Sequence, residues 1–269
     1  MKTTTTDDID ATTCYAVGRV IELTSADDGG SITIEILKQQ DVAHGRNSQV
    51  VFVKVVSGVL RRGQDDSLTI STGSTVFAKF YDIKYGPVAS GWAHENVQFC
   101  QESKDAEKHA YEKLDGLQGS DIPGCYGEYY FSRVGPFDKV SALLLQFIPD
   151  PPLYMTWVST PSKLATLKSR AFEVFQRIHA NGVFHGDITP QNLLWNSETE
   201  RLTVIDFEQA AFNDGDYLIH QENAAEQMAL FVKNREEDDI ALLWDTLCDI
   251  GVTDERPAPG PSPLAPTGW

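Results

Sequence analysis

Alternating apolar and polar residues predict β-strands in the first half of the chain. Residues 31–37 place an apolar side chain at every second position, which is the period of a strand with one buried face. Residues 50–56 and 74–81 are rich in β-branched and aromatic side chains, which pack well on a pleated sheet. Two further apolar runs, at 126–131 and 140–148, have the length of strands. The pattern therefore indicates a sheet built from the first 148 residues.

Apolar residues at helical spacing predict helices between and after these strands. Residues 102–117 carry one apolar stripe, and residues 164–178 carry a clean apolar face that ends at the helix stop Asn181-Gly182. Residues 222–232 and 236–250 continue the helical pattern in the last third of the chain. The second half is therefore expected to be mainly helical.

One β-hairpin interrupts this helical half. Two short apolar runs, residues 193–195 and 202–205, are joined by a polar turn. Asp187, Asn192 and Asp206 lie at the ends of the two runs, and such carboxylates and a carboxamide suit a proton acceptor and the oxygen ligands of a hard cation. A surface loop whose Asp and Asn cap a turn would carry the same residues. The helix before the hairpin and the strand within it favour the functional interpretation.

The hairpin and the loop before it resemble the catalytic and metal-binding loops of the protein-kinase-like superfamily. The motif His-x-Asp-x4-Asn reads His185-Gly186-Asp187-Ile-Thr-Pro-Gln-Asn192, and it is followed by Asp206-Phe207-Glu208. Gly186 replaces the usual arginine, as in aminoglycoside and choline phosphotransferases. The resemblance implies that Asp187 accepts or orients the proton of an acceptor hydroxyl, and that Asn192 and Asp206 bind magnesium.

A second resemblance lies in the strand at 74–81. Val76-Phe77-Ala78-Lys79 is similar to the kinase Val-Ala-Ile-Lys motif, whose lysine holds the α- and β-phosphates of the nucleotide. A lysine in a strand is otherwise a solvated edge residue, so its partner decides between the two interpretations. The first predicted helix offers Glu107, which lies beside the apolar stripe, and Glu112, which lies elsewhere on the helical wheel. We prefer Glu107 as the catalytic partner of Lys79, with Glu112 left open.

Two more segments are implied to bind the nucleotide. The turn at residues 43–49 is similar to a reduced kinase glycine-rich loop, in which Gly45 and Ser48 would contact phosphate oxygens; a plain hairpin turn is the alternative. At the end of the strand at 140–148, the resemblance implies that Gln146 and Ile148 line the adenine pocket through backbone groups. A plain interdomain linker would fit this second segment equally well.

The fold class implied by the resemblance is α+β: a two-lobed protein-kinase-like fold. A small antiparallel β N-lobe with one helix would precede a shortened, mainly helical C-lobe. The expected boundaries are a flexible tail at 1–12, the N-lobe at 13–148, the C-lobe at 149–252 and a proline-rich disordered tail at 253–269. Because only 63 residues follow Asp206, the activation segment and several C-lobe helices are expected to be short or absent.

Composition excludes several other classes of protein. The chain has 269 residues, a net charge of −17 and a pI near 4.6, which argues against nucleic acid or an anionic membrane as partner. Its four cysteines lie far apart without a Cys-x-x-Cys pair, so neither a zinc site nor a disulfide framework is indicated. There is no apolar run of membrane-spanning length and no secretory signal at the start, so a cytoplasmic protein is expected.

These observations predict an ATP-dependent phosphotransferase with Mg2+ as cofactor, in the first instance an atypical protein kinase that phosphorylates a hydroxyl. A small-molecule kinase of the aminoglycoside or choline type is one alternative. It is favoured by Gly186 and by acidic residues that could hold a cationic acceptor: Asp214, Asp216, Glu222 and Glu226. A pseudokinase or nucleotide-binding interaction module is the other, favoured by the short C-lobe. The identity of the acceptor, protein or cationic small molecule, and the oligomeric state are not encoded in these patterns.

Overall fold

The computed structural model describes residues 11–43, 46–62, 65–86, 93–132, 139–156, 160–213, 235–243 and 245–247. Several predictions lie outside these residues: Gly45, the four acidic residues after Asn213, the helix at 222–232 and the tail at 253–269. Contacts within the chain divide it into two compact units, which we describe separately. Unit 1 comprises Met1–Lys108 with Pro123–Ile148, and unit 2 comprises His109–Ile122 with Pro149–Trp269.

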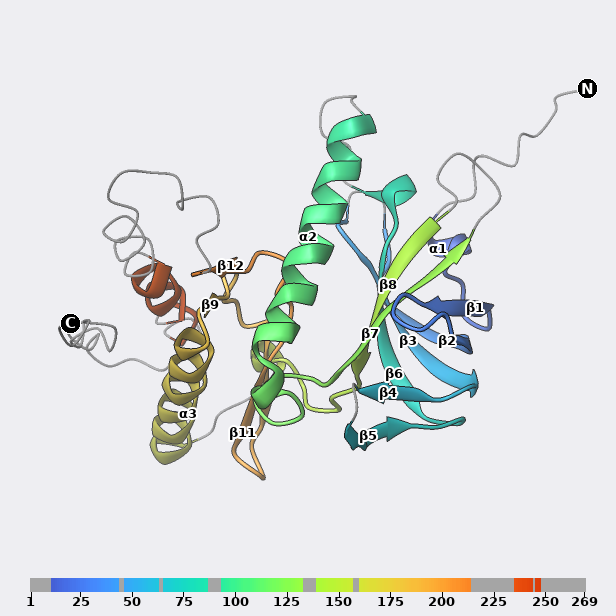
Figure 1. The fold of residues 1–269 in the computed structure, drawn as a ribbon. Helices are drawn as coiled ribbons and strands as arrows, with labels where there is room; N and C mark the ends of the chain where they lie inside the picture. The colour runs from blue at the N-terminus through green and yellow to red at the C-terminus, as the bar shows by residue number, and fades with distance from the viewer. Residues whose placement is uncertain are drawn as a thin grey trace, which may run out of the picture. The chain divides into compact units, whose positions relative to one another are not determined.

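Unit 1 is built on a closed antiparallel barrel (Figure 1). Its strands follow the order β1-β2-β3-β6-β8-β7 and are β1 (Val20–Ser25), β2 (Ser31–Asp41), β3 (Gln49–Ser57), β6 (Thr75–Tyr81), β7 (Cys125–Ser132) and β8 (Lys139–Gln146). The side chains of β3 alternate, so that Val51, Val53 and Val55 are buried in the core of unit 1. The predicted small sheet is in fact a barrel of six strands. Thr24 and Ser25 of β1 pair with β7 and close it, a contact that strand periodicity cannot foresee.

Shorter elements complete unit 1: α1 (Ala11–Cys14), β4 (Leu60–Arg62), β5 (Asp65–Ile70) and η1 (Ile83–Tyr85). Residues 1–10 of the predicted tail lie outside the described residues, and Ala11 in α1 is buried in the core. β4 and β5 pair antiparallel, with Leu60 opposite Ile70 and Arg62 opposite Asp65.

The long helix α2 (Ala93–Lys113) belongs to unit 1 as far as Lys108. It is bound to the barrel by Lys104 and Lys108, whose ammonium groups lie 2.8 and 3.0 Å from the carboxylate of Glu128 on β7. Burial by itself would raise the pKa of Glu128, but the two lysines outweigh it and hold that pKa below its usual value. These pairs fix the face that α2 turns toward the barrel.

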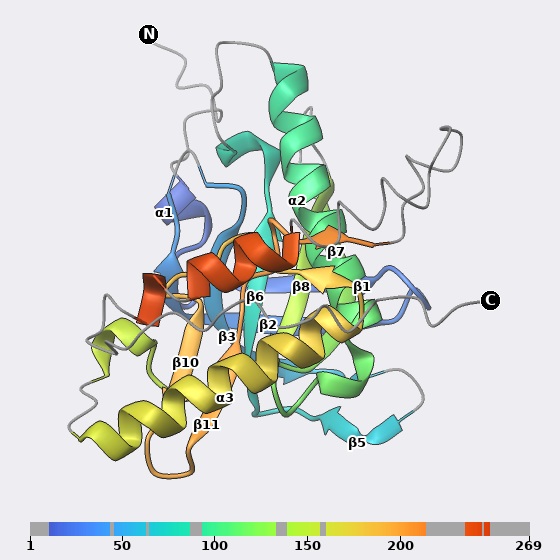
Figure 2. The same ribbon diagram turned by 90° about the vertical axis from the view of Figure 1, so that its left-hand side faces the viewer.

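In the part of unit 2 that the structure describes, there are one long helix, a further helical segment and short elements. Its elements are η2 (Asp115–Leu117), η3 (Leu153–Met155), α3 (Pro161–Ala180), β9 (Val183–Phe184), β10 (Leu193–Asn196), β11 (Arg201–Val204) and β12 (Ala211–Phe212). Residues 235–243 and 245–247, here called the C-terminal helical segment, are also helical. Figure 2 shows α3 lying beside the β10–β11 hairpin, and α3 contacts both β11 and β9. Among the helices of the described residues, none combines the length and hydrophobicity needed to cross a membrane.

Residues 109–122, which the prediction assigned to the N-lobe, group with unit 2. Within that unit the ring of Tyr111 lies 5.7 Å from the ring of Phe207, in an edge-to-face arrangement. The carbonyl of Asp121 accepts a hydrogen bond of 2.8 Å from the backbone N–H of Val204 on β11. The end of α2 and the turn after it are therefore attached to the hairpin, although they precede it by some eighty residues in sequence.

Candidate active site

Unit 1 contains a buried ion pair between β6 and α2. The Nζ atom of Lys79 lies 2.5 Å from Oε2 of Glu107, and the two residues are 4% and 0% exposed. Because β6 alternates, Lys79 points away from the barrel interior that Ala78 fills. Lys79 is thus not a solvated edge residue. The other candidate, Glu112, is exposed and lies 3.6 Å from His109.

Tyr81 is a third member of this cluster, which the sequence analysis did not identify. Its hydroxyl donates a hydrogen bond to Oε2 of Glu107, the same oxygen that Lys79 contacts. Tyr81 is 4% exposed and lies two residues after Lys79, on the same face of β6. The period of two along a strand was the available signal. From the sequence alone, however, a tyrosine near the end of a strand is indistinguishable from an ordinary core residue, because its hydrogen-bond partner is unknown.

The turn between β2 and β3 is closed by the side chain of Gln49, which is fully buried. Its amide oxygen accepts a hydrogen bond of 2.9 Å from the backbone N–H of Ala43, and its amide nitrogen donates one of 2.9 Å to the Ala43 carbonyl. Ser48 is buried beside it. The backbone donor of Ala43 is therefore committed to the turn itself. Any phosphate contact from this turn would come from other residues within it.

The end of β8 is similarly occupied. The backbone N–H of Gln146 donates to the Gly124 carbonyl at 2.7 Å, and its side-chain oxygen accepts from the Gly124 N–H at 3.0 Å. An adenine base bound here would have to contact a different group of Gln146. The side chain of Ile148 is half-buried. Three partly exposed phenylalanines lie close by: the rings of Phe52 and Phe77 are 4.9 Å apart, and those of Phe52 and Phe147 are 5.3 Å apart.

The loop before the hairpin in unit 2 brings Asp187 and Asn192 together. The amide nitrogen of Asn192 donates to the backbone carbonyl of Asp187 at 2.9 Å and to its carboxylate at 3.0 Å. These bonds assign the amide orientation and leave the oxygen of Asn192 as the atom suited to bind a cation. Asp206 follows β11 with a φ of 71°, a conformation that non-glycine residues adopt mainly at functional or strained positions.

His185 connects this loop to the segment that carries Asp206. Its Nδ1 accepts a hydrogen bond of 3.2 Å from the N–H of Asp187, so its Nε2 is the donor to the Ile205 carbonyl at 3.0 Å. The Ile205 N–H in turn donates to the Asn192 carbonyl at 3.0 Å. His185 is completely buried and acts on the geometry of the loop through these bonds.

Asp239, on the C-terminal helical segment, binds the backbone of the same loop. Its carboxylate accepts hydrogen bonds from the backbone N–H groups of His185 and Gly186, at 2.6 and 2.9 Å, and lies 3.1 Å from Nε2 of His179. Burial alone would raise the pKa of Asp239, but His179 and the two N–H groups outweigh it and lower that pKa. The sequence analysis missed this residue. Its signal was an acidic residue four positions before the buried Leu243, on the apolar stripe of the helix.

Gly186 is required by the backbone of the loop. Its φ is +75°, and a Cβ atom at this position would lie 2.5 Å from the Gln209 carbonyl oxygen. A residue with a side chain would meet both the strain of a left-handed conformation and a clash with fixed backbone. Position 186, where the usual motif has arginine, therefore requires glycine because two backbone segments approach each other closely there.

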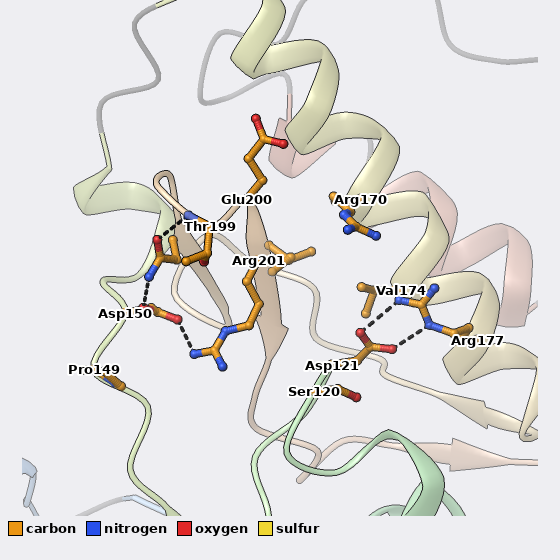
Figure 3. A pocket seen from close by; sticks show the side chains of 12 residues that line it. Ser120, Asp121, Pro149, Asp150, Arg170, Val174, Arg177, Thr199, Glu200 and Arg201 are labelled. Carbon is orange, nitrogen blue, oxygen red and sulfur yellow. Dashed lines mark hydrogen bonds and ion pairs between the residues drawn. The ribbon is translucent and has the colours of Figure 1, made fainter.

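A pocket of about 550 Å3 lies between α3, the β10–β11 hairpin and the segments before them (Figure 3). Arg177 donates through Nε and a terminal nitrogen to the Asp121 carboxylate at 2.6 and 2.9 Å, which raises the pKa of Arg177. Arg201 pairs with the nearly buried Asp150 at 2.6 Å. The pocket is lined by equal numbers of basic and acidic residues, whose charges balance: Arg170, Arg177, Arg201, Asp121, Asp150 and Glu200. Within unit 2, the Arg201–Asp150 pair attaches the hairpin to the segment before α3, and the Arg177–Asp121 pair attaches α3 to the turn after η2.

The comparison with known families shows that this protein is a member of the protein-kinase-like superfamily, of the aminoglycoside and choline phosphotransferase type. A family model described as the phosphotransferase enzyme family matches residues 51–215, and the chain belongs to this family. The matched span includes Lys79, Glu107, Asp187, Asn192 and Asp206. Gly45 and Ser48 precede it.

Proposed function

We propose that the chain transfers the γ-phosphate of ATP to a hydroxyl group. The observation that carries this proposal is the buried Lys79–Glu107 pair, present in one chain with the Asp187-Asn192 loop. Burying a lysine and a carboxylate is costly, and a simple core would gain more from apolar residues of similar volume. A lysine held at a defined position by a carboxylate is suited to contact phosphate oxygens. Lys79 is assigned this role.

Asn192 and Asp206 would hold the magnesium ion of Mg-ATP. Mg2+ prefers oxygen ligands, and these residues offer a carboxylate and an amide oxygen whose nitrogen is already bonded to Asp187. The ion supplies charge neutralisation for the phosphates. Asp187 would then orient the acceptor hydroxyl and take its proton.

The base of the nucleotide is assigned to the outer face of the barrel. Phe77 precedes Lys79 by two residues on β6, so both side chains leave the strand on the same face. With Phe52 and Phe147, it offers partly exposed aromatic surface on which a purine can stack. The backbone groups of Ile148 and the carbonyl of Gln146 are assigned to the edge of the base.

Two acceptor classes are consistent with this site. A protein hydroxyl is the first, because the motif His185-x-Asp187-x4-Asn192 resembles the catalytic loop of protein kinases. A small cationic molecule is the second, and it is supported by the family match and by Gly186, which stands in place of the kinase arginine. An enzyme of either kind would bind ATP in the same way, so the acceptor has to be found by assay.

The test begins with binding. Mg-ATP at 100 times its dissociation constant should stabilise the fold by about 2.7 kcal/mol, which a thermal-shift experiment detects. Turnover is then measured with panels of protein and amino-alcohol acceptors. A folded protein that shows no shift with millimolar Mg-ATP would refute the proposal. Binding without transfer to any acceptor would leave a nucleotide-binding module instead of an enzyme.

Two variants separate the roles of the carboxylates. Asp206→Asn should weaken magnesium-dependent ATP binding, because it removes charge from a metal ligand. Asp187→Asn should leave ATP binding nearly unchanged and slow transfer by roughly 10²–10⁴, the usual effect of losing a proton-transfer residue. Equal damage to binding in both variants would indicate collapse of the loop, not catalysis.

A further inference from the structure

The carboxylate of Glu107 is shared between two donors of different kinds. Lys79 donates to Oε2 with a charged ammonium group at 2.5 Å, and Tyr81 donates to the same oxygen with a neutral hydroxyl. All three residues are at least nine-tenths buried. Lys79 and Tyr81 are adjacent on one face of β6, and Glu107 reaches them from α2.

This arrangement bears on what happens when Lys79 contacts a phosphate. An ammonium group that turns toward a second anion donates less strongly to the first. The carboxylate left behind is fully buried, and loss of donors to a buried charge is costly. A tyrosine hydroxyl on the same oxygen reduces that cost, because it continues to donate while Lys79 engages the ligand.

We propose that Tyr81 is a positioning residue for phosphate binding: it holds Glu107 in place and makes Lys79 available to the phosphates. This inference rests on the function proposed above and extends it to a residue outside the sequence motif. Tyr81 touches neither nucleotide nor acceptor in this role. Its effect on the ligand passes entirely through Glu107 and Lys79.

The chain contains a matched control for the structural part of this contact. Tyr15 donates its hydroxyl to Oδ2 of Asp82 at 2.6 Å, and both residues are buried in unit 1. Tyr15→Phe therefore removes the same chemical bond, between a buried tyrosine and a buried carboxylate. Both Tyr15→Phe and Tyr81→Phe should lower the melting temperature. The change in ligand binding distinguishes them.

The experiment measures the dissociation constants of Mg-ATP and adenosine by calorimetry for the full chain. Tyr81→Phe should weaken Mg-ATP binding roughly tenfold, the equivalent of one hydrogen bond to a charged group, and should leave adenosine binding unchanged. Tyr15→Phe should change neither constant. Equal loss for adenosine and Mg-ATP, or no loss for either, would overturn the inference.

A double-mutant cycle provides the second criterion. In a Lys79→Met background, Tyr81→Phe should have no further effect on Mg-ATP, because its influence depends on the lysine. Lys79→Arg, which keeps the charge and moves the donors, replaces Lys79→Met if the latter is unfolded at the assay temperature. Additive losses would contradict the positioning role. Failure of the unmodified chain to bind Mg-ATP would refute the proposed function, whereas normal binding with an inert Tyr81→Phe refutes this inference alone.

Discussion

A carboxylate without solvent exposure is stable only where donors contact it, and Lys79 and Tyr81 both contact Oε2 of the buried Glu107. The pair differs from a surface salt bridge, whose net contribution is about 0–1 kcal/mol. Its loss leaves a buried charge with fewer partners. At the scale of single residues, the stability of unit 1 therefore depends on the contacts of Lys79 and Tyr81 with Glu107.

Lys79→Met should lower both nucleotide affinity and stability. We expect a loss of roughly 3–5 kcal/mol in the free energy of unfolding, the usual cost of breaking a buried pair by removing one partner. Arg170→Met is the control, since Arg170 forms an exposed pair with Glu173 at 2.9 Å and should cost at most about 1 kcal/mol. Denaturant unfolding measures both variants. Equal, small losses would mean that water reaches Glu107.

Gly186→Ala should destabilise unit 2 through backbone geometry alone. The left-handed conformation costs a non-glycine residue about 1–2 kcal/mol, and the clash with the Gln209 carbonyl adds to it. Gly18→Ala is the matched control, because Gly18 has a φ of +83° and open space around its Cβ position. The difference between the two unfolding free energies isolates the close contact. A difference near zero would show that the segment carrying Gln209 moves aside.

At the scale of elements, the loop that carries Asp187 and Asn192 is held by a helical segment that follows it in sequence. The C-terminal helical segment contacts the loop twice: Asp239 accepts from the backbone of His185 and Gly186, and Thr246 donates to the Ile188 carbonyl at 2.9 Å. Asp239 and Thr246 are seven residues apart, which is about two helical turns, so together they fix both the position and the direction of the loop. The β10–β11 hairpin alone would leave the first residues of the loop, His185 and Gly186, without these contacts.

Asp239→Asn should lower stability in a pH-dependent way. The pKa of Asp239 is depressed in the folded state, so its contribution is complete above the unfolded-state pKa of about 3.9 and is lost as the pH falls through the folded-state value. We expect a loss of roughly 1–3 kcal/mol near neutral pH that shrinks below about pH 4. Unfolding free energies between pH 2 and 7 measure it.

The neighbouring Asp238, which is exposed, provides the control for this experiment. Asp238→Asn should have little effect at any pH, because surface substitutions usually stay within about 0.5 kcal/mol. A gap between Asp239→Asn and the unmodified chain that stays constant down to pH 2 would indicate a steric cause and not the lost charge.

At the scale of the whole molecule, the chain comprises two compact units that the family match spans from residue 51 to residue 215. Every residue assigned above to transfer chemistry lies within this span. Asp239 and Thr246 lie beyond it, although they hold the loop in place. The part of the chain needed for a stable site therefore extends past the matched region, at least to residue 247.

Truncation after Asp254 tests where the required chain ends. Residues 255–269 contain five prolines and no apolar periodicity, so their removal should leave melting temperature and the response to Mg-ATP unchanged. Truncation after Leu242 removes Thr246 and the buried Leu247 and should lower the melting temperature clearly. A large loss of melting temperature on truncation after Asp254 would show that Leu264 or Trp269 docks on the core.

Local pattern was sufficient for the elements and for part of the site. Period-two alternation located β2, and runs of β-branched, aromatic or apolar residues located β3, β6, β7 and β8. A polar turn between two apolar runs located the β10–β11 hairpin. The helical wheel favoured Glu107 over Glu112, and the structure places Glu107 against Lys79. These inferences succeed because alternation, helical period and turn chemistry act over a few residues.

Contacts between distant segments were decided only by the tertiary structure. The closure of β1 on β7, the donation from Tyr81 to Glu107 and the binding of Asp239 behind the loop join residues 26 or more positions apart. The need for glycine at position 186 arises from the backbone at Gln209. A side chain's own sequence neighbours carry no record of such partners, because a buried polar group and a solvated one look alike until the chain that covers them has folded.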